Sequence, residues 1–324
     1  MGGNQVILGQ LPENQSLGVR PSYAMIKAGT WGEGAKQMNN FYPVSEFLHA
    51  DRQLNIRIGE SVLTEHYMEG FCAVTEEQSV NHPEYMSDAG KMSWKININK
   101  KIAYHAGYGA SRFFRSVNAF DMFWHAEGIK TEYSGEVILD GEVYDIIGEK
   151  SYGYADKNWG SDFTSPWLWI SSCNMKSLIT GKHLDDSAVE FGGGRPKVFG
   201  VSLGRRLLGG LYYEGRMYNY NFSYFWTKSK VVYQFKEGKG VNVWKIKAEN
   251  KESLLKLVLK CPAEEMLFIN YEAPNGKKLH NRLWNGGTGS GIILLYHKYG
   301  NKMRLADRIE IKNTGCEYGE YGVQ

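Results

Sequence analysis

Residues 151–175 read SYGYADKNWGSDFTSPWLWISSCNM, and this stretch carries the strongest indication of both fold and chemistry. Asp156 lies in it among closely spaced aromatic residues, which are Tyr152, Tyr154, Trp159, Phe163, Trp167 and Trp169. Because each packed ring buries roughly 150–250 Å², such a segment is expected to lie against other protein surface. A carboxyl in apolar surroundings has a raised pKa, and its neutral form donates protons. The alternative interpretation is structural: Asp156 caps a turn or pairs with Lys157 in a core strand.

The sequence around this stretch alternates in the manner of β-strands. Apolar residues alternate with lysines in 241–249 and again in 253–262, as expected for strands with one buried face. Asp140-Gly141 separates two strand-like runs and suits a type I′ hairpin turn, and Gly300-Asn301 predicts a second hairpin. Apolar residues at helical spacing do not extend beyond about ten residues anywhere, so helices are expected to be few and short.

These patterns predict an all-β protein built from antiparallel barrels. Closed or nearly closed barrels remove unpaired strand edges and can hold one apolar ligand. A length of 324 residues fits two domains of roughly 150 residues each. The polar segment after Met175 marks the predicted boundary, which gives an N-terminal domain of residues 1–175 and a C-terminal domain of residues 176–324.

Composition excludes several classes of partner. The net charge of +3 is small and both signs are mixed along the chain, so nucleic acid and membrane surfaces are not expected partners. No run of about 18 apolar residues occurs, so we expect no integral membrane segment, and the first residues lack the pattern of a signal peptide. The four cysteines are widely spaced, which favours reduced thiols and a cytoplasmic location.

Common catalytic and metal-binding motifs are missing from the sequence. The eight histidines form no HExxH pair, so no metal site is expected. GGTGSG at residues 286–291 lacks the lysine of a phosphate-binding loop and precedes a strand, so it is interpreted as a turn. No Gly-x-Ser-x-Gly nucleophile elbow occurs.

The central motif resembles a known family. GYADKNWG at residues 153–160, FTSPWLWISSCN at 163–174 and AFDMFWHAEG at 119–128 resemble segments of the tocopherol cyclase-like proteins. These are relatives of the carotenoid hydratases and of two-domain lipocalin-like proteins. The similarity runs from about Tyr23 to the C-terminal EYGEYG. It implies two lipocalin-like barrels, with an apolar or prenylated ligand inside the first barrel or where the two meet, and no cofactor.

The resemblance also implies roles for particular residues. Asp156 takes the place of the acid that protonates an alkene carbon. On a strand, Tyr154 and Asn158 project on the same face as Asp156, where they can orient its carboxyl, while Lys157 points the other way. His125 is predicted to return the proton to the acid or to accept one from the substrate. The predicted catalytic set is Asp156, Tyr154 and His125, and the predicted substrate-binding residues are Trp124, Tyr152, Asn158, Trp159, Phe163, Trp167, Trp169 and Asn174.

Each of these residues also has a structural interpretation, as a hydrogen-bonded polar group or as a core aromatic. The family interpretation predicts protonation of an isoprenoid double bond followed by capture of the cation by an internal phenol, which makes the protein an intramolecular lyase or isomerase. Capture by water instead would make it a hydratase. A non-catalytic carrier with the same barrel is the third alternative, and it needs no ionisable group at the ligand's alkene.

Overall fold

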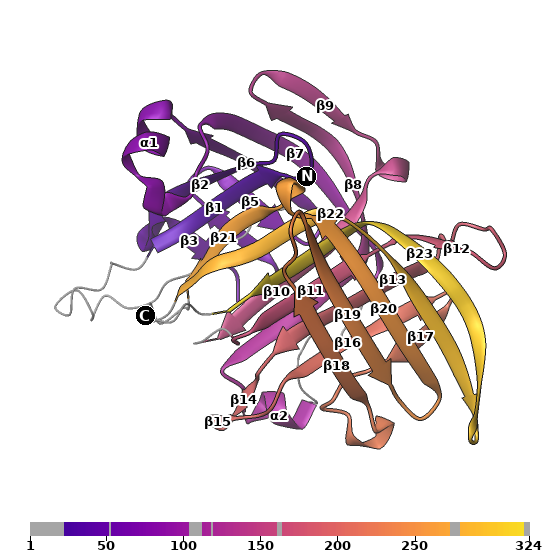
Figure 1. Cartoon of the computed structure of the whole chain (residues 1–324). Helices are drawn as coiled ribbons and strands as arrows, with labels where there is room; N and C mark the ends of the chain where they lie inside the picture. The colour runs from indigo at the N-terminus through magenta and orange to yellow at the C-terminus, as the bar shows by residue number, and fades with distance from the viewer. Residues whose placement is uncertain are drawn as a thin grey trace.

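A computed structural model describes residues 23–51, 53–103, 112–117, 119–160, 164–272 and 279–320. Within these ranges the protein is almost entirely β-structure, arranged as two large antiparallel sheets (Figure 1). The α-helices of the described ranges are short, namely α1 (Glu76–Asn81) and α2 (Arg112–Ser116). Single 3₁₀ turns occur at Val44–Glu46, Pro83–Tyr85, Gly148–Lys150, Phe225–Thr227 and Ala263–Glu265. No helix in the described ranges is long and apolar enough to cross a membrane.

The first sheet has the strand order β10-β8-β7-β6-β5-β4-β3, with β9 paired to β8. Its strands are β3 (Phe47–His49), β4 (Asn55–Ile58), β5 (Ser61–Thr64), β6 (Tyr67–Val74), β7 (Gly90–Ile102), β8 (Met122–Leu139), β9 (Glu142–Ile146) and β10 (Tyr152–Gly160). The turn between β8 and β9 confirms the predicted hairpin, since Asp140 and Gly141 have φ of 50° and 93°. These positive values are those that a type I′ turn requires.

The second sheet has the order β17-β16-β13-β11-β23-β22-β20-β19-β18, with β12 paired to β23 and β21 to β22. Its strands are β11 (Trp167–Ser172), β12 (Asn174–Ser177), β13 (Ser187–Gly194), β16 (Arg206–Tyr213), β17 (Arg216–Asn219), β18 (Lys230–Lys236), β19 (Val241–Glu249), β20 (Ser253–Pro262), β21 (Leu267–Glu272), β22 (Leu279–Tyr299) and β23 (Lys302–Gly319). A separate small pair consists of β14 (Lys197–Val198) and β15 (Val201–Ser202).

The concave interior of the second sheet is filled with large side chains. Trp244, Tyr220 and Phe191 are completely buried there, together with leucines and isoleucines of five other strands. The sheet curls so far that β16 and β18 lie next to each other. Alternation predicted this core correctly on β19 and β20, where the lysines lie on the opposite face.

The hairpin of β1 (Tyr23–Thr30) and β2 (Lys36–Pro43) lies between the two sheets (Figure 1). Ala24, Ile26 and Ala28 pack into the core of the first sheet. Met25, on the other face of β1, packs against Trp167 of the second sheet. The hairpin therefore contributes to the cores of both halves.

The fold prediction is confirmed as an all-β, antiparallel architecture with few short helices. In the described residues, however, no hydrogen-bonded strand pair joins the ends of either sheet, so closed lipocalin-like barrels are not observed. The first sheet ends with β10, and β11 already belongs to the second sheet, so the chain changes sheets between Gly160 and Trp167. A domain boundary between residues 175 and 176 stays a prediction.

Candidate active site between the two sheets

Asp156 is held by two side-chain donors. The indole Nε1 of Trp124 donates to Asp156 Oδ2 at 2.8 Å and also to the Tyr154 hydroxyl at 2.9 Å. The amide Nδ2 of Asn158 donates to the same carboxyl oxygen at 3.3 Å. Three of the predicted residues therefore surround the predicted acid.

The register of β8 and β10 explains this arrangement. Asn158 lies opposite Trp124 and Asp156 lies opposite Ala126, and directly opposed residues share one face of a sheet. This face turns toward the second sheet, because Trp124, Ala126 and Tyr154 pack with Ala188 of β13 and other residues there. The acid therefore lies where the two sheets meet, which is one of the two predicted locations.

The second sheet adds a carboxyl that the sequence analysis did not single out. Glu190 of β13 is completely buried, and its Oε1 accepts a hydrogen bond of 3.3 Å from Trp169 Nε1. Glu190 also hydrogen-bonds the hydroxyl of Tyr154. The ring of Tyr154 lies 5.0 Å from that of Trp169. Within the described residues Glu190 Oε2 has no hydrogen-bond partner. The hydroxyl of Tyr154 thus lies between two carboxyls.

Desolvation makes both carboxyls weak acids. It raises the pKa of Asp156 to about 7, while the hydrogen bond from Trp124 acts in the opposite direction. It also raises the pKa of Glu190 well above its ordinary value, which favours the neutral form of this buried group. Asp156 nevertheless keeps exposed surface. A ligand can therefore reach this carboxyl, although the protein around it displaces enough water to raise its pKa.

Two glycines make room for the indoles of this site. A Cβ atom on Gly192 would lie 2.9 Å from the ring of Trp124, and one on Gly315 would lie 2.5 Å from the ring of Trp169. Side chains at these positions would displace the rings and the donors that they carry. Glycine at these two positions therefore allows the tryptophan rings to pack directly on the backbone of the sheet.

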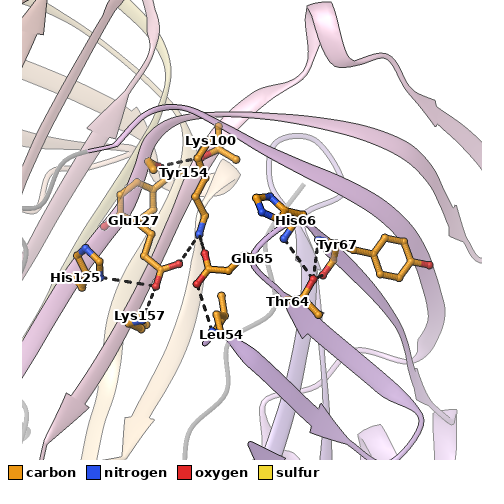
Figure 2. Close-up of polar contacts among 12 residues, drawn as sticks. Leu54, Thr64, Glu65, His66, Tyr67, Lys100, His125, Glu127, Tyr154 and Lys157 are labelled. Carbon is orange, nitrogen blue, oxygen red and sulfur yellow. Dashed lines mark hydrogen bonds and ion pairs between the residues drawn. The ribbon is translucent and has the colours of Figure 1, made fainter. Parts of the chain in front are cut away.

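His125 lies on the other face of β8, opposite Lys157. Its Nδ1 is 3.8 Å from an oxygen of Glu127, a buried carboxylate that also pairs with Lys157 and with Lys100, each at 2.7 Å (Figure 2). Lys100 pairs further with Glu65. Lys157 is thus not the partner of Asp156, which excludes that ion pair but not the other structural interpretation. The role predicted for His125 gains no support from its position.

The remaining predicted residues divide into two groups. Trp167 is buried between the sheets and donates from Nε1 to Glu317 Oε2 at 2.7 Å. Trp159, Tyr152 and Asn174 are exposed. They contact Phe123, Lys130 and Asn313 respectively. Phe163 lies outside the described residues. Substrate binding by all of the predicted residues stays a prediction.

Glu190 could have been found from its neighbours. The segment SAVEFGGG at residues 187–194 contains one charged residue in an otherwise apolar and small strand. A lone carboxyl in such a strand must either be exposed or lie in a built polar site. The contact between Glu190 and Tyr154 could not be predicted in this way, because Tyr154 belongs to the first sheet and Glu190 to the second.

Replacing Glu190 by glutamine is expected to change how stability depends on pH. The folded pKa of Glu190 lies above its unfolded pKa of roughly 4.3, so its contribution to stability is complete below pH 4 and is lost as the pH rises through the folded pKa. The melting temperature of the wild type should therefore fall from pH 4 to pH 8 more steeply than that of Glu190→Gln. Glu142→Gln, at an exposed site on β9, is the matched control. Parallel curves for wild type and Glu190→Gln would show that Glu190 is not held neutral.

The fold and the site together define a two-sheet β-protein with a weakly acidic, accessible carboxyl between its sheets. The chain belongs to the tocopherol cyclase-like family, whose model matches residues 25–319. A solved structure of kievitone hydratase from Nectria haematococca is 13% identical to this chain, with a TM-score of 0.47, and the match covers 94% of this chain and 82% of that one. No curated protein matches the sequence.

Proposed function

We propose that the protein is a tocopherol cyclase-like enzyme in which Asp156 protonates an isoprenoid double bond and an internal phenol of the substrate captures the resulting cation. The observation that carries the proposal is the Asp156 carboxyl, whose pKa is raised to about 7 while its face remains accessible between the sheets. We also propose that both sheets have a lipocalin-like architecture and that the substrate lies where they meet.

The first step is transfer of the Asp156 proton to the less substituted alkene carbon. The positive charge then forms on the tertiary carbon, and the carboxylate charge that develops on Asp156 is stabilised by the N–H groups of Trp124 and Asn158. The π faces of Trp169 and Tyr154 are suited to stabilise a nearby cation, by roughly 0.5–2 kcal/mol per contact. Ring closure by a phenol oxygen then completes a reaction in which no oxidation state changes.

Tyr154 of β10 acts on the acid from the first sheet, and Glu190 of β13 acts on it from the second. Burial disfavours a negative charge on Glu190, and such a charge would oppose the carboxylate that forms on Asp156. The hydroxyl of Tyr154, fixed by the indole of Trp124, orients the carboxyl. These two residues therefore support the acid without exchanging atoms with the substrate.

A hydratase differs only in the nucleophile, which would be water, and it stays the alternative within the enzyme class. A carrier of an apolar ligand is the alternative outside it. A carrier gains nothing from a desolvated carboxyl held by three polar side chains, since burial of such a group costs free energy. The hydrogen-bonded acid favours an enzyme.

Isotope labelling tests the proposal directly. A prenylated hydroquinone incubated with the protein in heavy water should gain one deuterium, on the carbon next to the new carbon–oxygen bond, because Asp156 exchanges its proton with solvent between turnovers. In ¹⁸O-labelled water a cyclase leaves no heavy oxygen in the product, whereas a hydratase incorporates one. Tight binding of a broad panel of such substrates, with no product and no deuterium uptake, would contradict the enzyme and support the carrier.

A further inference from the structure

An exposed apolar surface covers one end of the molecule, where α2 and the hairpin of β14 and β15 lie together (Figure 1). Both elements pack on a small core cluster formed by Ala119, Phe120 and Phe123. The backbone N–H of Phe199, in the hairpin turn, donates to the carbonyl oxygen of Ala119 at 2.8 Å, and Val198 forms a bridge with Phe120. The hairpin is therefore fixed to the segment that leads into β8.

The outer side of this cluster carries large apolar side chains that are exposed. They are Phe113, Val117, Phe199 and Val201, and we call them the apolar end. Phe113 is 66% exposed and Phe199 is 65% exposed. Exposed apolar side chains that occur singly need no explanation, but a group of them on one surface indicates an interaction site. The apolar end is therefore a candidate docking surface.

The backbone at Phe199 has a conformation that does not suit its side chain. Phe199 and Gly200 form the two-residue turn of the hairpin, with φ of 48° and 75°, as a type I′ turn requires. Glycine and asparagine tolerate positive φ, whereas a bulky residue there is a genuine exception. Because the ring is mostly exposed, packing inside the protein does not account for phenylalanine at this position. The strain points to a role for the ring outside the fold.

The charges around the apolar end are basic. Residues 112–117 and 195–206 together contain six arginine and lysine residues and no aspartate or glutamate. Arg195 and Arg206 are exposed on either side of the hairpin. Two other basic residues of the hairpin segment form ion pairs, at 3.6 and 4.0 Å, with acidic residues outside it. The surface around the apolar end therefore keeps a positive charge.

We propose that the apolar end docks on an anionic lipid bilayer. The apolar side chains enter the boundary between headgroups and acyl chains, and the surrounding basic side chains bind lipid phosphates. The net charge of +3 does not indicate this partner, because acidic residues elsewhere in the chain balance the basic residues of this surface. The inference is independent of the proposed function, since docking requires no chemistry at Asp156.

Flotation of the protein with lipid vesicles tests the inference. The probes are vesicles of phosphatidylcholine and phosphatidylglycerol in equal parts and vesicles of phosphatidylcholine alone. The wild type should bind the anionic vesicles at least about tenfold more tightly than the neutral ones, because each basic residue near an anionic surface adds to binding. Added salt should weaken this binding by screening the charges. Equal binding to the two kinds of vesicle, or binding to neither, would overturn the inference.

Phe199→Asn separates docking from folding. Asparagine suits the positive φ at this position, so the melting temperature should not fall below that of the wild type. Binding to the anionic vesicles should fall by about 5- to 30-fold, because the ring no longer enters the bilayer. Phe71→Asn, the same change at an exposed site on β6, should keep wild-type binding. Wild-type binding by Phe199→Asn would contradict a role for the apolar end.

A double variant tests the basic residues. Arg195→Gln with Arg206→Gln should bind the anionic vesicles about 25-fold less tightly, at about fivefold for each charge removed. Lys245→Gln with Lys247→Gln, at exposed sites on β19, is the matched control and should bind like the wild type. Sedimentation without vesicles tests the other occupant, a second copy of this chain. A dimer that Phe199→Asn converts to a monomer, with no vesicle binding by the wild type, would overturn the inference.

Discussion

Replacing Asp156 by asparagine is expected to reduce kcat by about 100- to 10,000-fold, the range that general acid catalysis usually contributes. The amide has nearly the same shape and still accepts the hydrogen bond from Trp124, but it has no proton to transfer. The melting temperature should stay close to that of the wild type, because the packing around position 156 is unchanged. Turnover of a prenylated hydroquinone and a thermal melt of the same preparation measure both quantities.

The matched control is Asp145→Asn, an identical chemical change at an exposed position on β9. It should leave both activity and stability unchanged. If Asp156→Asn keeps most of the activity, Asp156 is not the proton donor, and the raised pKa of its carboxyl has a structural origin.

Replacing Trp124 by phenylalanine is expected to give the second largest loss, about 10- to 100-fold in kcat. The substitution keeps an aromatic ring but removes the N–H that stabilises the developing carboxylate, and a hydrogen bond to a charged group contributes about 1.5–3 kcal/mol. The same N–H lowers the pKa of Asp156, so its removal raises that pKa further. Since the protonated acid is the active form, the activity of the wild type should fall as the pH rises through about 7, and that fall should move to higher pH in Trp124→Phe.

A pH profile of kcat/KM for both proteins checks the direction of this shift. Trp226→Phe is the control, because Trp226 is exposed and stacks on Tyr224 at a centroid distance of 5.0 Å. Its profile should coincide with that of the wild type. A Trp124→Phe profile that moves to lower pH would contradict the role assigned to the indole N–H.

The strands were predictable because their signals are local. Alternation over nine residues is enough to place Trp244, Ile246 and Ala248 in a core, whatever packs against them. The order of the strands within the sheets was not predictable, because strands such as β11 and β23 pair although about half of the chain separates them. Whether curled sheets close into barrels depends on the hydrogen bonds of the end strands, for which alternation carries no information.

The candidate site was predictable in part for the same reason. Period-two spacing places Tyr154, Asp156 and Asn158 on one face, and the structure confirms this. The same rule, applied to β8, separates the adjacent residues Trp124 and His125, so the sequence already argued against a shared site for them. Glu190 comes close to the acid only through packing of the second sheet, and no local pattern encodes that packing.

The position of the β1–β2 hairpin has a consequence for synthesis of the chain. The side chain of Gln37 on β2 donates to the backbone of Phe268 on β21, 231 residues later. At about 5–20 residues per second, a ribosome needs roughly 10 to 50 seconds to make that intervening length. During this time the hairpin can dock on the first sheet. Its other face, which includes Met25, stays uncovered until the strands that pack on it have been synthesised. A chaperone that holds nascent apolar strands would find its target there, on a face that is synthesised early and covered late.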